Sequence, residues 1–231
     1  MRKQQAIWQS EHDHETTIPG MADVEPASGV VRFVAYLQEI GITPPATVID
    51  IGCGKGRNSI FMASKGFNVQ ALDYIQSALD TAVQLAEHRK VLDKITFKRA
   101  EIDKPWDFPD DFFELAIDSY SSIDIETKEG RDVYVQELYR TLKPGGFALV
   151  TVVSADDEWE KQLIAASPGA EPNSTIWPQS GKFQKDYTES ELRGFYKDFK
   201  IEQLQKLSKP GFKLGKHYQS TNFWAVLRKA V

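Results

Sequence analysis

Residues 48–73 read VIDIGCGKGRNSIFMASKGFNVQALD, and this stretch decides the fold. The β-branched run Thr47–Ile51 predicts a short buried strand that ends at a glycine-rich turn. A helical pattern of apolar residues follows over residues 57–64. Residues 67–72 predict a second strand, which ends at Asp73. Strand, helix and strand in this order are typical of a βαβ unit in a parallel sheet.

The same alternation of strands and helices continues along the rest of the chain. Helices are predicted at residues 27–40, 57–64, 75–88, 129–142 and 188–197. Strands are predicted at residues 47–51, 67–72, 95–98, 112–117, 147–153, 201–207 and 223–228. This order predicts an α/β fold with a doubly wound, Rossmann-like sheet of seven strands. Such sheets bind ligands beyond the carboxyl ends of their strands.

Composition narrows the class of protein. The chain has 231 residues, with 28 Lys and Arg against 33 Asp and Glu, so its formal net charge is −5. This mildly acidic balance makes nucleic acid an unlikely partner. No window approaches about 18 consecutive apolar residues, and no apolar stretch follows the basic N-terminus as in a signal peptide. The single cysteine, Cys53, excludes an internal disulfide, so we expect a cytoplasmic protein without membrane partners.

The length predicts one domain, which we expect to span residues 27–231. Residues 1–26 are expected to form an N-terminal lid or tail. Residues 167–187 contain several prolines and lack any periodicity, which predicts an excursion over the surface. We expect the wider segment 154–187 to form a cap over a substrate.

Acidic residues fall at the ends of three predicted strands, namely Asp50, Asp73 and Asp118. The turn that begins at Asp50 reads DIGCGKG, with glycine at every second position from Gly52. Glycine lets a ligand lie against the backbone, and the helix that follows presents free N–H groups to it. Asp73 lies 23 residues after Asp50, near the spacing at which an acid reaches ribose hydroxyls. Together these features predict a nucleoside site.

The glycine pattern differs from two common phosphate-binding turns. The dinucleotide fingerprint G-x-G-x-x-G needs a sixth-position glycine counted from Gly52, where this chain has Arg57, and the P-loop pattern is absent. The remaining pattern resembles the first motifs of class I S-adenosylmethionine-dependent methyltransferases. The resemblance continues in LAIDSYSSID, LYRTLKPGGFALV, FYKDFKIEQLQKL and NFWAVLRK, and it implies an antiparallel last strand. The run GCGKGRNS is also similar to small-molecule and tellurite-resistance-type members.

The resemblance implies S-adenosyl-L-methionine as the cofactor and a role for each matched position. The glycines would let the methionine part pass close to the backbone, with Asp50 fixing its ammonium group. Asp73 would accept both ribose hydroxyls, and either Glu101 or Asp103 would face the adenine. The implied cofactor-binding residues are Asp50, Gly52, Gly54, Gly56, Asn58, Asp73, Tyr74, Ile75, Glu101, Ile102, Asp118 and Ser119. No metal is implied.

Methyl transfer is an in-line displacement on an activated sulfonium, so the protein mainly has to align the reactants and exclude water. By the resemblance, Asp118 and Tyr120 would lie between the sulfonium and the acceptor. If the acceptor is a hydroxyl or a thiol, Tyr120, Asp124 and His217 are candidates for moving or positioning its proton. The catalytic candidates are therefore Asp118, Tyr120 and His217.

Several features have two interpretations. Trp8 belongs either to a segment that folds over the cofactor or to a tail. His12 and His14 form an H-x-H pair, which without further ligands favours a solvated tail over a metal site. The lysine-rich stretch at 206–216 is either a solvated connection or a grip on an anionic substrate. Trp177, Phe183 and Tyr187 either line an acceptor pocket or pack their loop.

The sequence thus predicts transfer of a methyl group from S-adenosyl-L-methionine to a small-molecule acceptor. One alternative is a protein of the same fold that binds the cofactor without catalysis. Another is an RNA or protein methyltransferase, which only the lysine-rich stretch supports. A nicotinamide-dependent oxidoreductase is disfavoured by Arg57. The acceptor atom and the oligomeric state stay open.

Overall fold

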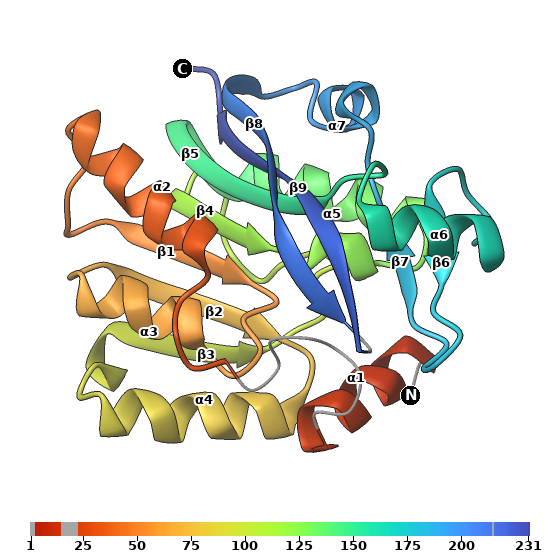
Figure 1. Ribbon diagram of the computed structural model, residues 1–231. Coiled ribbons are helices and arrows are strands. Elements are labelled where there is room, and N and C mark those ends of the chain that lie inside the picture. Colours follow the sequence, from red (N-terminus) through yellow and green to blue (C-terminus); the bar gives the residue numbers. More distant parts are fainter. Residues whose placement is uncertain (1–2, 15–22, 214) are drawn as a thin grey trace.

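The computed structural model describes residues 3–14, 23–213 and 215–231 (Figure 1). Its main sheet has seven strands in the order β3-β2-β1-β4-β5-β9-β8. The strands are β1 (Thr47–Ile51), β2 (Asn68–Asp73), β3 (Ile95–Arg99), β4 (Phe113–Ser119), β5 (Leu142–Val153), β8 (Lys200–Lys213) and β9 (Lys216–Arg228). The first five are parallel to one another, whereas β9 is antiparallel to both β5 and β8. The predicted sheet with an antiparallel last strand is confirmed.

Helices cover both faces of this sheet, which explains why its strands are apolar on both sides (Figure 1). They are α2 (Ser28–Glu39), α3 (Arg57–Ser64), α4 (Gln76–His88), α5 (Lys128–Thr141) and α7 (Glu189–Phe195), with short 3₁₀ turns η1 (Leu92–Lys94) and η2 (Ser122–Asp124). Side chains alternate along each strand. Val48 therefore packs in the cluster that contains residues of α2, α3 and α4, and Ile49 packs in the cluster with α5 and α7.

The segment between β5 and α7 contains more structure than predicted. It forms α6 (Glu158–Ala166) and a separate two-stranded sheet of β6 (Ser174–Ile176) and β7 (Phe183–Lys185). Residues 182–187 are all buried, so the prediction of a surface excursion over 167–187 is wrong for these residues, whereas most of 167–181 is exposed or half-buried. The sequence did not reveal this burial because most side chains of β7 are polar. Polar side chains usually mark an exposed face, but here the side chains on both faces are buried.

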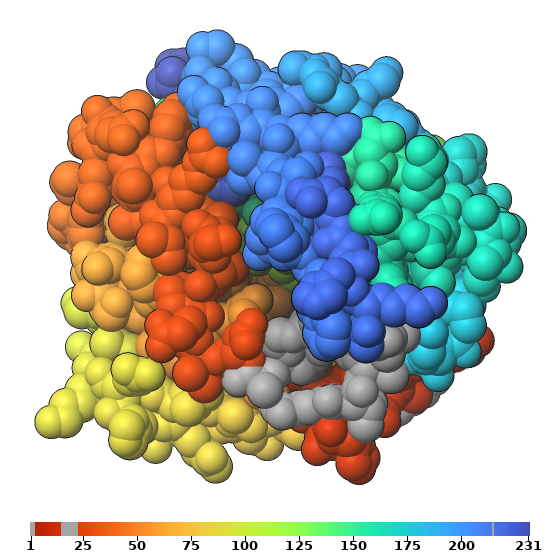
Figure 2. All heavy atoms as spheres, in the orientation of Figure 1, coloured from red at the N-terminus to blue at the C-terminus, as the bar shows by residue number. Residues whose placement is uncertain are grey.

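The last two strands are longer than predicted and form a hairpin that extends past the sheet (Figure 1). Their pairing continues to Lys213 and Lys216 at the turn. The space-filling view shows a hollow between this hairpin, drawn in blue, and the orange region of α2 and the residues just before it (Figure 2). In the ranges that the structure describes, none of the helices is long and apolar enough to cross a membrane.

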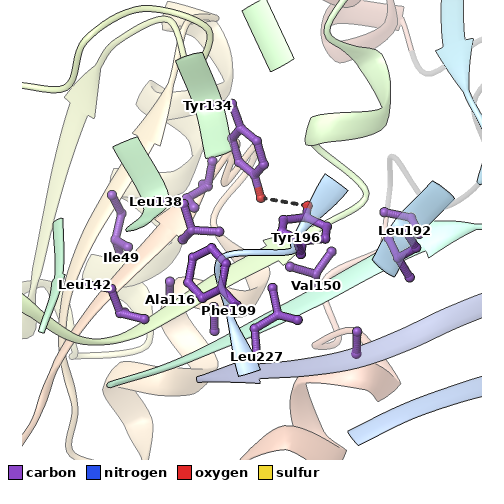
Figure 3. Close-up of a cluster of buried hydrophobic side chains, with 14 of the residues drawn as sticks. Ile49, Ala116, Tyr134, Leu138, Leu142, Val150, Leu192, Tyr196, Phe199 and Leu227 are labelled. Atoms are coloured by element: carbon purple, nitrogen blue, oxygen red, sulfur yellow. Dashed lines mark hydrogen bonds between the residues drawn. The ribbon is translucent and has the colours of Figure 1, made fainter. Parts of the chain in front are cut away.

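The cluster on the α5 side also contains a polar contact that fixes two aromatic side chains (Figure 3). Tyr134 on α5 and Tyr196 after α7 are both fully buried, and their hydroxyl oxygens are 3.5 Å apart. The Tyr134 hydroxyl also donates to Asp118 at the end of β4, at 2.7 Å. The core on this face is therefore tied directly to the carboxyl edge of the sheet.

Candidate active site at the carboxyl edge of the sheet

A pocket of about 470 Å³ opens where β1, β2 and β4 end. One end is formed by the glycine turn after β1 and by the residues that follow β2 and β3. The other end is formed by α6, β7 and the β8–β9 hairpin. Of the expected cofactor-binding residues, those that line it are Gly52, Gly54, Asn58, Asp73, Tyr74, Glu101, Ile102 and Ser119. Asp50, Gly56, Ile75 and Asp118 do not line it.

The glycine turn has the backbone that the sequence pattern requires. Gly52, Gly54 and Gly56 have φ angles of +68°, +55° and +79°. The Cys53 N–H donates to the Leu72 carbonyl at 2.8 Å, which holds the turn against β2. A Cβ at Gly56 would lie 2.9 Å from the Ala82 side chain, so this glycine permits the close packing of α3 on α4. The first two glycines line the pocket and the third supports them.

Asp73 presents a fixed carboxylate to the pocket. Its Oδ2 accepts the Gly54 N–H at 2.8 Å, and its Oδ1 accepts the Ile75 N–H at 2.9 Å. Burial raises the pKa of Asp73, while these two N–H groups act in the opposite direction. Each oxygen keeps one further lone pair to accept a hydroxyl. The arrangement suits a ligand with two neighbouring hydroxyl groups.

Asp50 and Asp118 lie beneath the pocket and hold its walls from opposite faces of the sheet. Asp50 Oδ2 accepts the Ser59 hydroxyl of α3 at 2.5 Å. Asp118 Oδ2 accepts the Tyr134 hydroxyl, and its Oδ1 accepts the Ser121 N–H at 2.8 Å. Burial raises the pKa of Asp118, and it raises the pKa of Asp50 to about 6. In the structure both carboxylates position other parts of the site.

The raised pKa of Asp50 predicts a pH-dependent stability. Folding stabilises its protonated form, so this contribution is present below the unfolded pKa of about 3.9 and is lost as pH rises through about 6. We expect the unfolding free energy of Asp50→Asn, relative to the natural protein, to grow by about 3 kcal/mol between acidic and neutral pH. Urea denaturation across this range measures it, with the exposed Asp80→Asn as the matched control. A constant difference for Asp50→Asn would contradict the assignment.

Helix α1 (Lys3–His14) lies below the tip of the β8–β9 hairpin in the view of Figure 1. It contributes Gln4, Gln5, Trp8 and His12 to the lining of the pocket. The His12 side chain of this helix lies beside Gly54 and near Asp73, and burial lowers the pKa of its imidazole. The interpretation of this stretch as a solvated tail is therefore wrong for His12, whereas His14 is exposed. Trp8 belongs to a segment that lies over the pocket.

Polar contacts hold α1 at both of its ends. The Gln4 side chain donates to the Phe183 carbonyl and accepts the Phe183 N–H, both at 3.0 Å. Farther along the helix, Gln9 donates to the Ser77 hydroxyl of α4 at 2.7 Å, and near the other end this hydroxyl donates to Asp13 at 2.9 Å. Because the buried side of α1 is polar rather than an apolar stripe, periodicity could not predict that the helix docks there.

Gln4→Ala is expected to loosen α1 from β7. It removes both hydrogen bonds to Phe183, each worth about 0.5–1.5 kcal/mol, so exchange of the Phe183 amide hydrogen should rise by about ten-fold. Hydrogen–deuterium exchange of the peptide around β7 measures the effect. Ser10→Ala, on the exposed side of the same helix, is the matched control. Unchanged exchange in Gln4→Ala would show that another contact holds α1.

The residues predicted to move or position the acceptor's proton differ in whether they line the pocket. Tyr120 lines the pocket with φ +67°, and burial raises the pKa of its hydroxyl to about 12. Asp124 also lines the pocket, where its Oδ1 lies 3.1 Å from Lys182 Nζ, and burial raises its pKa to about 6. His217 is exposed near the tip of the hairpin, against Phe212, and is not among the lining residues.

In the aromatic and lysine-rich segments, too, some residues line the pocket and others lie outside it. Trp177 lines the pocket, whereas Phe183 and Tyr187 are buried outside its lining. Lys206 pairs with Asp156 on the surface, but Lys213 is buried in the pocket and lies 3.1 Å from Glu160 Oε1. The lining residues that the sequence did not indicate include Glu160, Lys182, Gln184 and Tyr218. They come from segments far apart in the chain, so no local motif brings them together.

Comparison with known proteins gives one family match. Residues 48–146 match the family model described as "Methyltransferase domain". Among curated proteins, the ubiquinone biosynthesis O-methyltransferase of Rickettsia conorii (strain ATCC VR-613 / Malish 7) is 29% identical over 107 residues. That alignment covers 46% of this chain and 35% of the relative. The chain therefore spans about a third of that relative's length.

Two solved structures have the same fold over most of the chain. A SAM-dependent methyltransferase from Methanosarcina mazei has a TM-score of 0.73 at 21% identity, with 84% of this chain and 97% of that chain covered. The 1,6-didemethyltoxoflavin-N1-methyltransferase of Burkholderia thailandensis has a TM-score of 0.66 at 18% identity. There, 98% of this chain and 88% of that chain are covered, and S-adenosylhomocysteine is bound in that structure.

Proposed function

Because residues 48–146 match a methyltransferase domain and the whole sheet has the class I methyltransferase topology, we propose that this protein transfers a methyl group from S-adenosyl-L-methionine to a small-molecule acceptor. The observation that carries the proposal is the pair formed by the glycine turn and Asp73. The turn leaves room for a ligand against its backbone, and the carboxylate beside it is oriented by two N–H groups.

The residues at this end of the pocket fit the proposed cofactor. Gly52 and Gly54 provide a surface without side chains for its methionine part, and Asp73 accepts its two ribose hydroxyls. Glu101 and Ile102, which follow β3, line the pocket where an adenine ring would lie. When bound, the cofactor supplies a methyl group that its sulfonium already activates. The protein then has only to orient the acceptor and exclude water.

A small acceptor is supported by the closure of the pocket. Helix α1 and the β8–β9 hairpin both contribute lining residues, among them Trp8 and Tyr218. Their aromatic rings restrict access of water and of large substrates. Tyr120 and Asp124 lie at the acceptor end and are the residues that we propose for positioning the nucleophile. The role of residues 154–187 as a substrate cap is part of the same proposal.

Calorimetric titration with S-adenosylhomocysteine tests the cofactor, with NAD titrated in parallel. We expect a dissociation constant in the micromolar range for S-adenosylhomocysteine and no binding of NAD. Absence of binding in a folded sample would contradict the proposal. Binding with no methyl transfer to any member of a broad panel of small acceptors would favour the non-catalytic alternative.

A further inference from the structure

We propose that the acceptor end of the pocket recognises a neutral, planar heteroaromatic ring that presents a hydrogen-bond donor beside a hydrogen-bond acceptor. The lactam edge of a pyridone or quinolone is the simplest group of this kind. This inference rests on the proposed function for identifying that end as the acceptor site, and it adds the chemical class of the acceptor. It assigns recognition of the ring edge to Glu160 and Trp177.

Glu160 and Trp177 each have a buried polar atom that lacks a partner. Their side chains are 2% and 3% exposed, and both line the pocket. Within the part of the chain that the structure describes, Glu160 Oε2 and Trp177 Nε1 form no hydrogen bond. A buried polar group without a partner is costly, so a ligand that reaches both atoms would gain by satisfying them. Here one group accepts and the other donates.

Lys213 lies against both side chains and occupies one of the two Glu160 oxygens. Its Nζ lies 3.1 Å from Glu160 Oε1 and 4.4 Å from the centre of the Trp177 ring. An ammonium group can only donate, so Oε1 is committed to Lys213 and Oε2 is the oxygen left for a ligand. The indole nitrogen can only donate. A ligand that satisfies both must therefore offer a donor to Glu160 and an acceptor to Trp177.

The buried charges favour a neutral ligand over an anion. Lys213 is paired with Glu160, and Lys182 is paired with Asp124 at 3.1 Å. Both ammonium groups also lie over the Trp177 ring, at 4.4 and 4.6 Å from its centre. Each buried positive charge thus has a carboxylate of its own. An anionic ligand would have to displace one of these carboxylates, so Lys182 and Lys213 favour a neutral ligand.

The walls of the same end favour a planar ring. Trp8 of α1, Tyr120 after β4, Trp177 between β6 and β7, and Tyr218 of β9 all line the pocket. Aromatic side chains pack on flat rings in stacked or edge-to-face arrangements, and pockets of this size are lined mainly by hydrophobic and aromatic side chains. Glu160 and Trp177 would then form hydrogen bonds with the edge of a ring that the aromatic side chains enclose.

Two probes that differ in one group test the proposal on the intact chain. Protein saturated with S-adenosylhomocysteine is titrated with 2-quinolone, which has an N–H beside its carbonyl, and with 1-methyl-2-quinolone, which lacks that N–H. We expect 2-quinolone to bind at least about ten-fold more tightly, because only it can donate to Glu160 Oε2. Equal affinities, or no binding of either probe at millimolar concentration, would overturn the proposal.

Two variants assign the discrimination to its residues. In Glu160→Gln the amide oxygen must face Lys213, which leaves an NH₂ group toward the ligand, so the preference for 2-quinolone should disappear. Trp177→Phe keeps a ring but removes the donor, so it should weaken both probes by about ten-fold and leave their ratio unchanged. A preference that survives Glu160→Gln, or affinities that Trp177→Phe leaves unchanged, would contradict the assignment.

The affinity for S-adenosylhomocysteine shows whether a negative result comes from this inference, from the proposed function or from a misfolded variant. Both variants should bind S-adenosylhomocysteine as the natural protein does, since neither residue lies at the glycine turn. A variant that loses this affinity has changed the fold, and Glu160→Asp then replaces Glu160→Gln. If the natural protein itself does not bind S-adenosylhomocysteine, the proposed function fails. The probes are then titrated onto the free protein, where their discrimination still decides the class of ligand.

Discussion

Asp73→Ala is expected to weaken the binding of S-adenosylhomocysteine by at least about ten-fold and, if both ribose hydroxyls bind in full, by on the order of a thousand-fold. The carboxylate would accept two charge-assisted hydrogen bonds, each worth about 1.5–3 kcal/mol. Its two oxygens are already oriented by the N–H groups of Gly54 and Ile75, so little entropy is lost on binding. Calorimetric titration at neutral pH measures the change.

Two further variants show whether the loss comes from the ribose contact. Asp73→Asn keeps the shape of the side chain, but its NH₂ group must face a backbone N–H of Gly54 or Ile75, so it should also lose most of the affinity. Asp80→Ala removes an exposed carboxylate from α4 and should change nothing. If Asp73→Ala bound S-adenosylhomocysteine as tightly as the natural protein, the proposed position of the ribose would be wrong.

Gly52→Ala is expected to have the second large effect, a loss of about 2–4 kcal/mol in the free energy of unfolding together with weaker cofactor binding. Gly52 has φ +68°, where a side chain strains the backbone. Its new Cβ would also lie 2.6 Å from the Ser121 Cβ, closer than two carbon atoms can approach. The ends of β1 and β4 would have to separate. Urea denaturation measures the stability.

Substitutions at Ser121 separate the two causes of this loss. Ser121→Ala removes only the hydroxyl, so it should relieve part of the contact with the new Cβ of Gly52→Ala. Ser121→Gly removes the Cβ as well and should relieve the rest, which leaves only the backbone strain. The unfolding free energies of the double variants should therefore depart from the sum of the single effects. The departure should be larger when Gly52→Ala is combined with Ser121→Gly than when it is combined with Ser121→Ala. Additive effects would show that the two residues do not compete for this space.

The cofactor end of the site could be predicted from the sequence because its determinants are local. The glycine turn and Asp73 lie within one βαβ unit, and the strand pattern places Asp73 and Asp118 at one edge of the sheet. The pattern did not show which side chains face the ligand. Asp50 and Asp118 have helices packed against them, and their hydrogen bonds to Ser59 and Tyr134 depend on that packing.

The sequence indicated Tyr120, Asp124 and Trp177 at the acceptor end, and all three line the pocket. The rest of this end could not be predicted because contacts between distant segments build it. Glu160 meets Lys213 across 53 residues, and Gln4 meets Phe183 across 179 residues. Neither pair has a sequence spacing that a pattern can reveal. Polar side chains on α1 and β7 also suggest exposure, although several of them are buried. His217, whose chemistry would suit the site, is exposed near the tip of the hairpin and is not among the lining residues.

The order in which the chain builds the pocket has a consequence for how such a protein diverges. The glycine turn and the acids after β2 and β3 precede β5, whereas Glu160, Trp177, Lys182, Lys213 and Tyr218 all follow it. The match to the methyltransferase domain ends at residue 146, within β5. A single crossover in this strand would therefore join one ancestor's nucleoside end, together with Trp8, Tyr120 and Asp124, to the part of another's acceptor end that follows β5. Mutations after β5 can then adapt the protein to a new acceptor while the cofactor-binding part before β5 stays unchanged.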